Sequence, residues 1–185
     1  MKNKLLNFFS SIAVLLVLPL SVESLELVIG EERIEPGIVA IFEGAIKDHI
    51  HPESLHLQED LTEVHIEARV NWDEKNIPEG TPGGGFVPYL RITALVTNQK
   101  TGLRTFVDLL PHINLIDNFH YARNIALPGN SKDLYSVEFN LIPPPDVELA
   151  LHRDWAVLFG GSLFKAVHFK YTDVDFSEIA SASRR

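Results

Sequence analysis

The sequence predicts an all-β protein with an immunoglobulin-like antiparallel β-sandwich fold. Roughly seven short segments rich in β-branched and aromatic residues follow one another, with turn signals between them. The clearest of them, residues 62–72, alternates without a break between apolar and polar side chains, which is typical of a strand with one face in a core. The chain has no cysteine, so the disulfide of antibody domains cannot hold this sandwich together.

In chain order, we expect strands at residues 25–29, 37–46, 62–72, 88–97, 103–110, 134–142 and 163–172. Residues 98–102 are expected to form the turn of a hairpin, and the three prolines at 143–145 should end the strand before them. Residues 111–130 are expected to be irregular, and residues 146–162 to form a loop or a short helix. The polar, Ser-rich tail at 173–185 is expected to fray.

Residues 1–24 have the three-part pattern of a secretory signal peptide. A positively charged start precedes an almost unbroken apolar run at 12–20, which is short for a membrane span, and mostly small or polar residues follow it. We expect cleavage before Leu25, which leaves a domain at residues 25–172 followed by the tail. The mature protein is therefore expected in the periplasm, without direct insertion into the membrane.

The composition of the mature chain restricts its partners and ligands. The formal net charge of the whole chain is −9, and it becomes −10 when residues 1–24, with two lysines and one glutamate, are removed. Such an acidic protein is not suited to bind nucleic acid or an anionic membrane surface, but it can attract cations. The single methionine is Met1, so a metal site in the mature chain must use imidazole nitrogen and oxygen ligands instead of sulfur.

The polar face of the strand at 62–72 carries two side chains that can bind a metal or exchange protons. His65 and Glu67 are two residues apart, so they point to the same face with their Cα atoms about 7 Å apart. The alternation alone leaves two interpretations open, an ordinary solvated face and one edge of a metal site.

Histidines are spread along the rest of the chain, and no pair has a close metal-binding spacing. The others are His49, His51, His56, His112, His120, His152 and His168. Because loops cluster at the ends of a sandwich, histidines from loops and strand ends can still converge there.

Motifs for catalysis are missing from the sequence. It has no nucleophile elbow, no phosphate-binding loop and no dinucleotide fingerprint. The glycines at 83–85 precede a strand and do not lie between a strand and a helix, so they are interpreted as a flexible turn. We therefore do not expect an enzyme.

Four short segments stand in a recognisable order: VHIEA at 64–68, GFVPYL at 85–90, HYARNIA at 120–126, and FK with FKYT within 164–172. In this order they resemble the periplasmic high-affinity iron-transport protein family (the Tpd type), which accompanies an iron permease of the inner membrane. The resemblance spans residues 37–172. It implies an immunoglobulin-like sandwich, a homodimer, and a site near the dimer interface that binds copper, with iron or manganese at the same or a neighbouring site.

The resemblance also implies which residues bind the metal. His65 and Glu67 match the His-x-Glu strand of the family, and His120 matches its histidine followed by tyrosine. His112 falls where a Met-Pro-Met segment of the family supplies a ligand methionine. His152, followed closely by an aspartate, matches a further histidine ahead of the last strand, although the loop length differs.

The donor types predict how this site should behave. A site of histidine and carboxylate without sulfur favours Cu(II), Fe or Mn, with Zn(II) as a further candidate, over Cu(I). Ligating histidines must be neutral, so metal affinity should fall as the pH drops through about 6.5. Asp48, His49 and His51 are candidates for a second, exposed site, whereas His56 and His168 are expected to be structural or surface residues.

Three functions stay open at this point. The working hypothesis is a periplasmic metal-binding protein that acts in high-affinity iron uptake with an inner-membrane iron permease. One alternative is a periplasmic copper-binding or copper-resistance carrier, which the lack of methionine and cysteine in the mature chain disfavours. The other is a β-sandwich interaction module that binds no metal.

Overall fold

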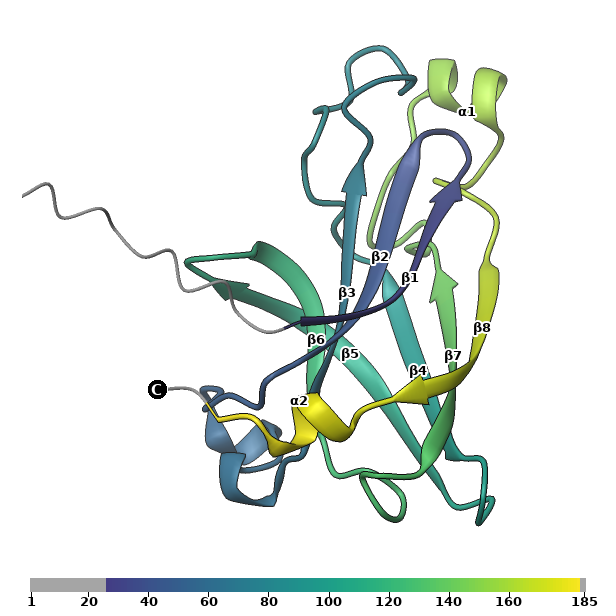
Figure 1. Cartoon of the computed structure of the whole chain (residues 1–185). Coiled ribbons are helices and arrows are strands. Elements are labelled where there is room, and N and C mark those ends of the chain that lie inside the picture. The colour runs from purple at the N-terminus through teal and green to yellow at the C-terminus, as the bar shows by residue number, and fades with distance from the viewer. Residues whose placement is uncertain (1–25, 184–185) are drawn as a thin grey trace, which may run out of the picture.

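The computed structural model describes residues 26–183, so the signal peptide expected at 1–24 lies outside the described residues. Within this range, antiparallel strands pair in the order β1-β2-β3-β6-β5-β4-β7-β8 (Figure 1). They are β1 Glu26–Ile34, β2 Ile38–Ala45, β3 Val64–Trp72, β4 Arg91–Asn98, β5 Arg104–Asn114, β6 Asn118–Ile125, β7 Leu134–Ile142 and β8 Val167–Asp175. The connections contain the short helices α1 Arg153–Phe159 and α2 Ser177–Ser181, and 3-10 turns at Glu53–Leu55 and Glu59–Leu61. No helix in the described part of the chain is long and apolar enough to cross a membrane.

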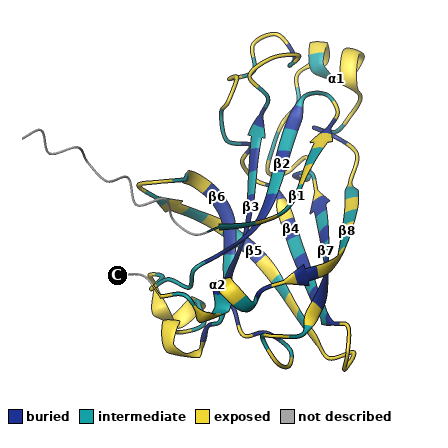
Figure 2. Cartoon of the chain, in the orientation of Figure 1, coloured by how far each residue is buried: buried dark blue, intermediate teal, exposed yellow. Residues whose placement is uncertain are grey.

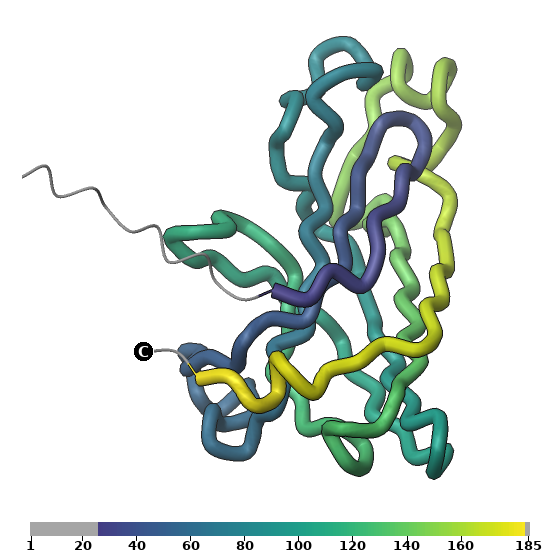
Figure 3. The backbone as a smooth tube through the Cα atoms, viewed as in Figure 1, coloured from purple at the N-terminus to yellow at the C-terminus, as the bar shows by residue number. Residues whose placement is uncertain are grey.

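Strand β5 joins the two layers of the sandwich. Its residues up to Leu109 pair with β4, and those from Leu110 onward pair with β6. One layer therefore contains β1, β2, β3 and β6, and the other contains β4, β7 and β8 (Figure 1 and Figure 3). Between the layers, Phe42 of β2 stacks on Phe139 of β7 with the ring centroids 4.2 Å apart, and neither ring is exposed. This arrangement confirms the predicted antiparallel sandwich.

The two edge strands, β1 and β8, meet through one tyrosine. The Tyr171 hydroxyl donates a hydrogen bond of 2.9 Å to the carboxylate of Glu32. A Cβ atom at Gly30 would lie 2.2 Å from the Tyr171 ring, so the ring can lie against β1 only where that strand has glycine. The contact therefore links the two edges of the sheet at this point.

The segment 111–130, which was expected to be irregular, contains the end of β5 and all of β6. The turn between these strands depends on Asn114, whose side-chain oxygen accepts hydrogen bonds from the backbone N–H groups of Ile116 and Asp117. Asn118 then adopts a φ of 63°, a left-handed conformation that asparagine tolerates better than most residues. Asn114, Asp117 and Asn118 are the turn signal of this segment, which was not predicted from the sequence.

The C-terminal segment is more ordered than the sequence suggested. The polar tail expected at 173–185 begins too early, because β8 continues to Asp175 and α2 follows it. Phe176 is completely buried and Ile179 is 3% exposed, and both belong to the hydrophobic core. The Ser-rich composition hid these apolar residues, whose burial fixes the segment to the sandwich.

Candidate metal centre

The central strand β3 is buried on both faces, and this places His65 and Glu67 inside the protein (Figure 2). Each of these two side chains is only 2% exposed. In the sheet, His65 lies opposite Asn124 of β6, and Glu67 lies opposite Glu43 of β2 and Ala122 of β6. The face that carries His65 and Glu67 is therefore not an ordinary solvated face.

Three histidines from three strands converge on this face. His112 of β5 and His120 of β6 are directly opposite each other in the hairpin, and His65 approaches them from β3. One ring nitrogen from each residue lies within 4.8 Å of the others. The ring centroids are 5.3 Å apart for His65 and His112, 5.8 Å for His112 and His120, and 6.3 Å for His65 and His120. Within residues 26–183, this histidine triad is the one group of three or more His, Asp or Glu residues whose ligand atoms lie this close together.

Hydrogen bonds select the tautomer of two of these rings. The Asn124 amide nitrogen donates to the carbonyl oxygens of Asp48 and Leu57, so the amide oxygen is the acceptor of the 2.7 Å hydrogen bond with His65 Nδ1. His120 Nδ1 lies 3.1 Å from the carbonyl oxygen of Asn118 and must be the donor there. In a neutral imidazole the lone pair is then on Nε2 of both rings, which is the form that binds a metal.

His112 is held in the neutral form that a metal needs. Burial and the neighbouring imidazoles of His65, His120 and His56 lower the pKa of His112 to about 3. Its Nε2 atom is buried without a hydrogen-bond partner. A buried nitrogen with a lone pair and no donor nearby costs free energy unless a cation or a donor group satisfies it. The triad therefore fits a transition-metal ion.

Glu67 adds a carboxylate to the edge of the triad. Its Oε1 atom is 3.6 Å from His65 Nε2. Burial, followed by the charges of Asp117, Glu43 and Glu26, raises the pKa of Glu67 to about 8. Without a cation the carboxyl group therefore keeps its proton at neutral pH, and a bound cation would favour the ionised form. The ion pair of Arg69 with Glu43, 2.6 Å long, lies next along the same face.

The structure does not bring His152 to the triad within one chain. His152 precedes α1, whose Trp155 packs against Trp72 at the far end of β3, with ring centroids 6.1 Å apart. His65 is seven residues earlier on that strand, which corresponds to roughly 23 Å. Figure 1 shows α1 and the loop before β3 at opposite ends of the sandwich. The match of His152 to the family's further histidine, in a loop of different length, did not predict how far His152 lies from the triad.

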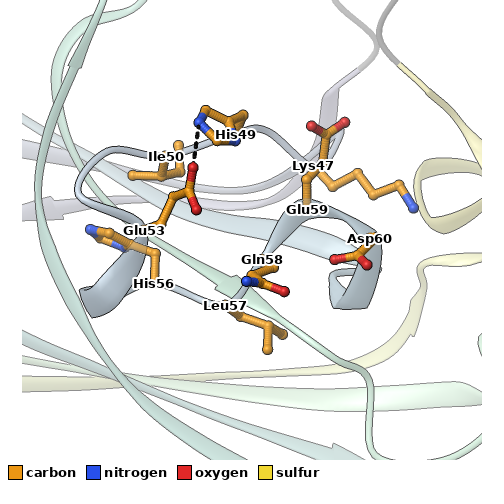
Figure 4. A pocket seen from close by; sticks show the side chains of 9 residues that line it. All are labelled: Lys47, His49, Ile50, Glu53, His56, Leu57, Gln58, Glu59 and Asp60. Carbon is orange, nitrogen blue, oxygen red and sulfur yellow. Dashed lines mark ion pairs between the residues drawn. The ribbon is translucent and has the colours of Figure 1, made fainter.

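The exposed candidates do not form a second cluster of three ligands in the described part of the chain. His49 Nε2 is 3.4 Å from Glu53 Oε1, an ion pair on the rim of a pocket of about 380 Å³ (Figure 4). Asp48 accepts a hydrogen bond from the His49 backbone, and His51 is exposed. His168, on β8, pairs with Glu138 of β7 at 3.2 Å, as expected for a surface residue.

One residue near the triad was not expected there. His56 belongs to the connection between β2 and β3, residues 46–63, and its ring lies edge-on to His112 with the centroids 5.0 Å apart. It lines a cavity of about 590 Å³ together with all three histidines of the triad. The presence of three histidines in this short connection was the available signal, but spacing alone did not distinguish His56 from its neighbours.

Comparison with known proteins gives consistent matches. The profile of a family described as Fe2+ transport protein matches residues 23–178. The 34 kDa membrane antigen of Treponema pallidum (strain Nichols) is 29% identical over 131 residues, which cover 70% of this chain and 63% of that relative. The chain thus spans less than two thirds of the relative's length.

Solved structures share the fold. Copper-reconstituted P19 from Campylobacter jejuni superposes with a TM-score of 0.66 at 25% identity, over 80% of this chain and 94% of P19. A copper-bound variant of FetP from uropathogenic Escherichia coli strain F11 superposes with a TM-score of 0.64 at 24% identity, over 80% of this chain and 95% of FetP.

Proposed function

Because the chain belongs to the Fe2+ transport protein family, we propose that it is a periplasmic metal-binding protein of high-affinity iron uptake. The observation that carries the proposal is the convergence of His65, His112 and His120, with their ligand nitrogens within 4.8 Å of one another. A buried group of three imidazoles has no evident use in a plain interaction module. In this function the metal is a cargo, and the protein is a carrier and not an enzyme.

The side chains of the site would handle charge as follows. The three imidazoles bind as neutral ligands and leave the charge of a divalent cation uncompensated. Glu67, as a ligand or as the nearest carboxylate, loses its proton when the cation enters and supplies one negative charge. The set of nitrogen and oxygen donors suits Cu(II), Fe, Mn or Zn(II), and offers no soft ligand to Cu(I).

A homodimer would give His152 a role that it cannot have within one chain. The tip of the β5–β6 hairpin, next to the triad, is largely exposed (Figure 2). Its exposed apolar residues are Ile113, Leu115, Ile116 and Phe119. An apolar surface of this kind is suited to a second copy of the chain. His152 of that copy could then complete the site, as the resemblance implies. The dimer would deliver iron to a permease of the inner membrane.

Metal analysis tests the proposal. Purified wild-type protein, loaded with Fe(II), Mn(II), Cu(II) or Zn(II) and passed through a desalting column, should retain one ion per site. A variant with both His65→Ala and His120→Ala should retain none, while His168→Ala, on the outer surface, should behave as the wild type. Equal stoichiometric metal in all three proteins would reject the site.

The physiological role needs a separate test. Deletion of the gene should impair growth under iron limitation, and restoration should require the triad. Impaired growth only under copper excess would favour the alternative of a copper carrier. Sedimentation of the wild type and of Ile116→Asp tests the dimer, since a charge at the hairpin tip should shift the protein to a monomer.

A further inference from the structure

The connection between β2 and β3 brings a fourth imidazole next to the triad. The separation between the rings of His56 and His112, 5.0 Å, is shorter than any ring separation within the triad. His56 Nδ1 is buried and has no hydrogen-bond partner, and the same is true of His112 Nε2. Two adjacent rings thus each hold a buried nitrogen that nothing in the protein satisfies, although such groups are normally paired.

The ring separations agree with ligation of one ion. A metal–nitrogen bond is about 2.0–2.1 Å long, so the centroid of a ligating imidazole lies about 3.2 Å from the metal. The centroids of two such rings are then about 5 Å apart at a tetrahedral angle and about 6.4 Å apart when the rings lie on opposite sides of the metal. The three separations within the triad, 5.3 to 6.3 Å, fall in this range, and so does the 5.0 Å between His56 and His112. His56 is not within the group whose nitrogens lie within 4.8 Å, so its ring would need to move toward the triad.

The connection is attached to the site on both sides of His56. The amide nitrogen of Asn124 holds the carbonyl oxygens of Asp48 and Leu57 at 2.8 and 3.0 Å, while its oxygen orients His65. Between these anchors, His56 lines both the cavity of the triad and the outer pocket shown in Figure 4. In Figure 4, His56 and Glu53 lie on one side of this pocket and Lys47, Glu59 and Asp60 on the other.

We propose that His56 is a fourth imidazole ligand of the metal held by His65, His112 and His120, so that metal binding fastens residues 46–63 over the site. This inference rests on the proposed function, because it requires the triad to bind a metal. The chemical class of ligand is a divalent transition-metal ion that accepts four nitrogen donors. Release of His56 alone would reopen the site while three ligands still hold the ion, which provides a route for transfer.

The test compares His56→Gln with His51→Gln, a matched control because His51 is an exposed histidine in the same connection and lines the same cavity. Cu(II) is the probe. Electron paramagnetic resonance should show one nitrogen donor fewer in His56→Gln than in the wild type and in His51→Gln, whether or not His152 of a second copy also binds. The Cu(II) affinity of His56→Gln should fall at least tenfold, which is the lower end of the loss seen when even a residue outside the ligand set is removed.

Hydrogen exchange measured with and without Cu(II) compares each protein with itself, so a difference in stability between the variants does not hide the effect of the ion. Cu(II) should slow exchange of the amides at residues 53–57 in the wild type and in His51→Gln, but not in His56→Gln. No slowing in the wild type, or an unchanged spectrum and affinity in His56→Gln, would overturn the role of His56. If the wild type binds Cu(II) and only the double variant of His65 and His120 loses it, the proposed function stands without His56. A wild type that binds no metal would reject both.

Discussion

Replacing Glu67 with glutamine should stabilise the metal-free protein at neutral and alkaline pH. Glu67 lies on the central strand with 2% of its surface exposed, and burial raises its pKa from 4.5 to about 8. The carboxylates of Asp117, Glu43 and Glu26 contribute to the same shift, which Arg69 opposes. Glutamine has nearly the same shape and carries no charge. The substitution therefore removes the cost of protonating the carboxyl group on folding, or, above about pH 8, the cost of burying it in the ionised form.

The size of the effect follows from the pKa difference. In the unfolded chain the carboxyl ionises near pH 4.5, whereas the folded protein keeps the proton up to about pH 8. The folded state thus binds more protons in this window, and the free energy of unfolding falls as the pH rises through it. At about 1.4 kcal/mol per pKa unit, the cost is roughly 3 kcal/mol at pH 7 and about 5 kcal/mol above pH 8. Glu67→Gln should therefore melt on the order of 6–12 °C above the wild type at pH 7.

Thermal unfolding after chelator treatment, followed by circular dichroism from pH 5 to 9, measures this difference. The gap between the two melting temperatures should widen up to about pH 8 and then level off. Glu79→Gln, which changes an exposed loop carboxylate, should melt like the wild type at every pH. A saturating divalent cation should narrow the gap, because the ionised Glu67 then faces a positive charge. A gap that does not change with pH, or a variant that melts below the wild type, would refute the raised pKa.

Four further outcomes are expected. Asn124→Ala should lower Cu(II) or Zn(II) affinity about 10- to 100-fold in competition titrations, because it removes the hydrogen bond that orients His65. An unchanged affinity would show that this hydrogen bond is dispensable. Tyr121→Phe should cost roughly 2–3 kcal/mol in urea unfolding, because the hydroxyl makes two buried backbone hydrogen bonds, and a cost near zero would contradict their contribution. His112→Met should raise the affinity for Cu(I) relative to Cu(II), measured with chelators selective for each ion; a constant ratio would contradict the assignment of His112 as a ligand. Burial and the neighbouring imidazoles lower the pKa of His112 to about 3, so its protonation should not contribute to a loss of metal affinity between pH 7 and 5. A plot of metal affinity against pH should therefore have the same slope for His112→Gln as for the wild type.

The local pattern of the sequence was sufficient to predict the class of fold, but for His65 and Glu67 it left open both a solvated face and one edge of a metal site, and only the family resemblance favoured the metal site. Alternation at 62–72 predicts a strand and places His65 and Glu67 on one face, because successive side chains of a strand point to opposite sides. The same rule could have found β6, whose turn signal at 114–118 was overlooked. It could not show that the second face of β3 is also buried, since the side chains that lie against His65 there, those of His112, His120 and Asn124, come from β5 and β6, far along the chain.

The convergence of the triad was decided by strand pairing. His112 and His120 are neighbours because the hairpin register pairs them directly, and a register shift of one residue would turn one of the two side chains to the other face. His65 joins them because β3 pairs with β6, across more than fifty positions of sequence. Such long-range pairing depends on the packing of the whole sandwich, which periodicity within one segment does not contain.

The sequence by itself thus determined the donor types available to a metal, since a chain without cysteine, whose one methionine is Met1, offers nitrogen and oxygen ligands beyond its first residue. Only the tertiary structure showed which of the eight histidines lie close together, and it brought together His65, His112 and His120, which the family resemblance had implied as ligands. It placed His56 beside His112 and left His152 at the far end of β3. The reason is that a loop residue is positioned by the backbone contacts that anchor its loop, here the two carbonyl oxygens held by Asn124, and those contacts join segments far apart in the chain.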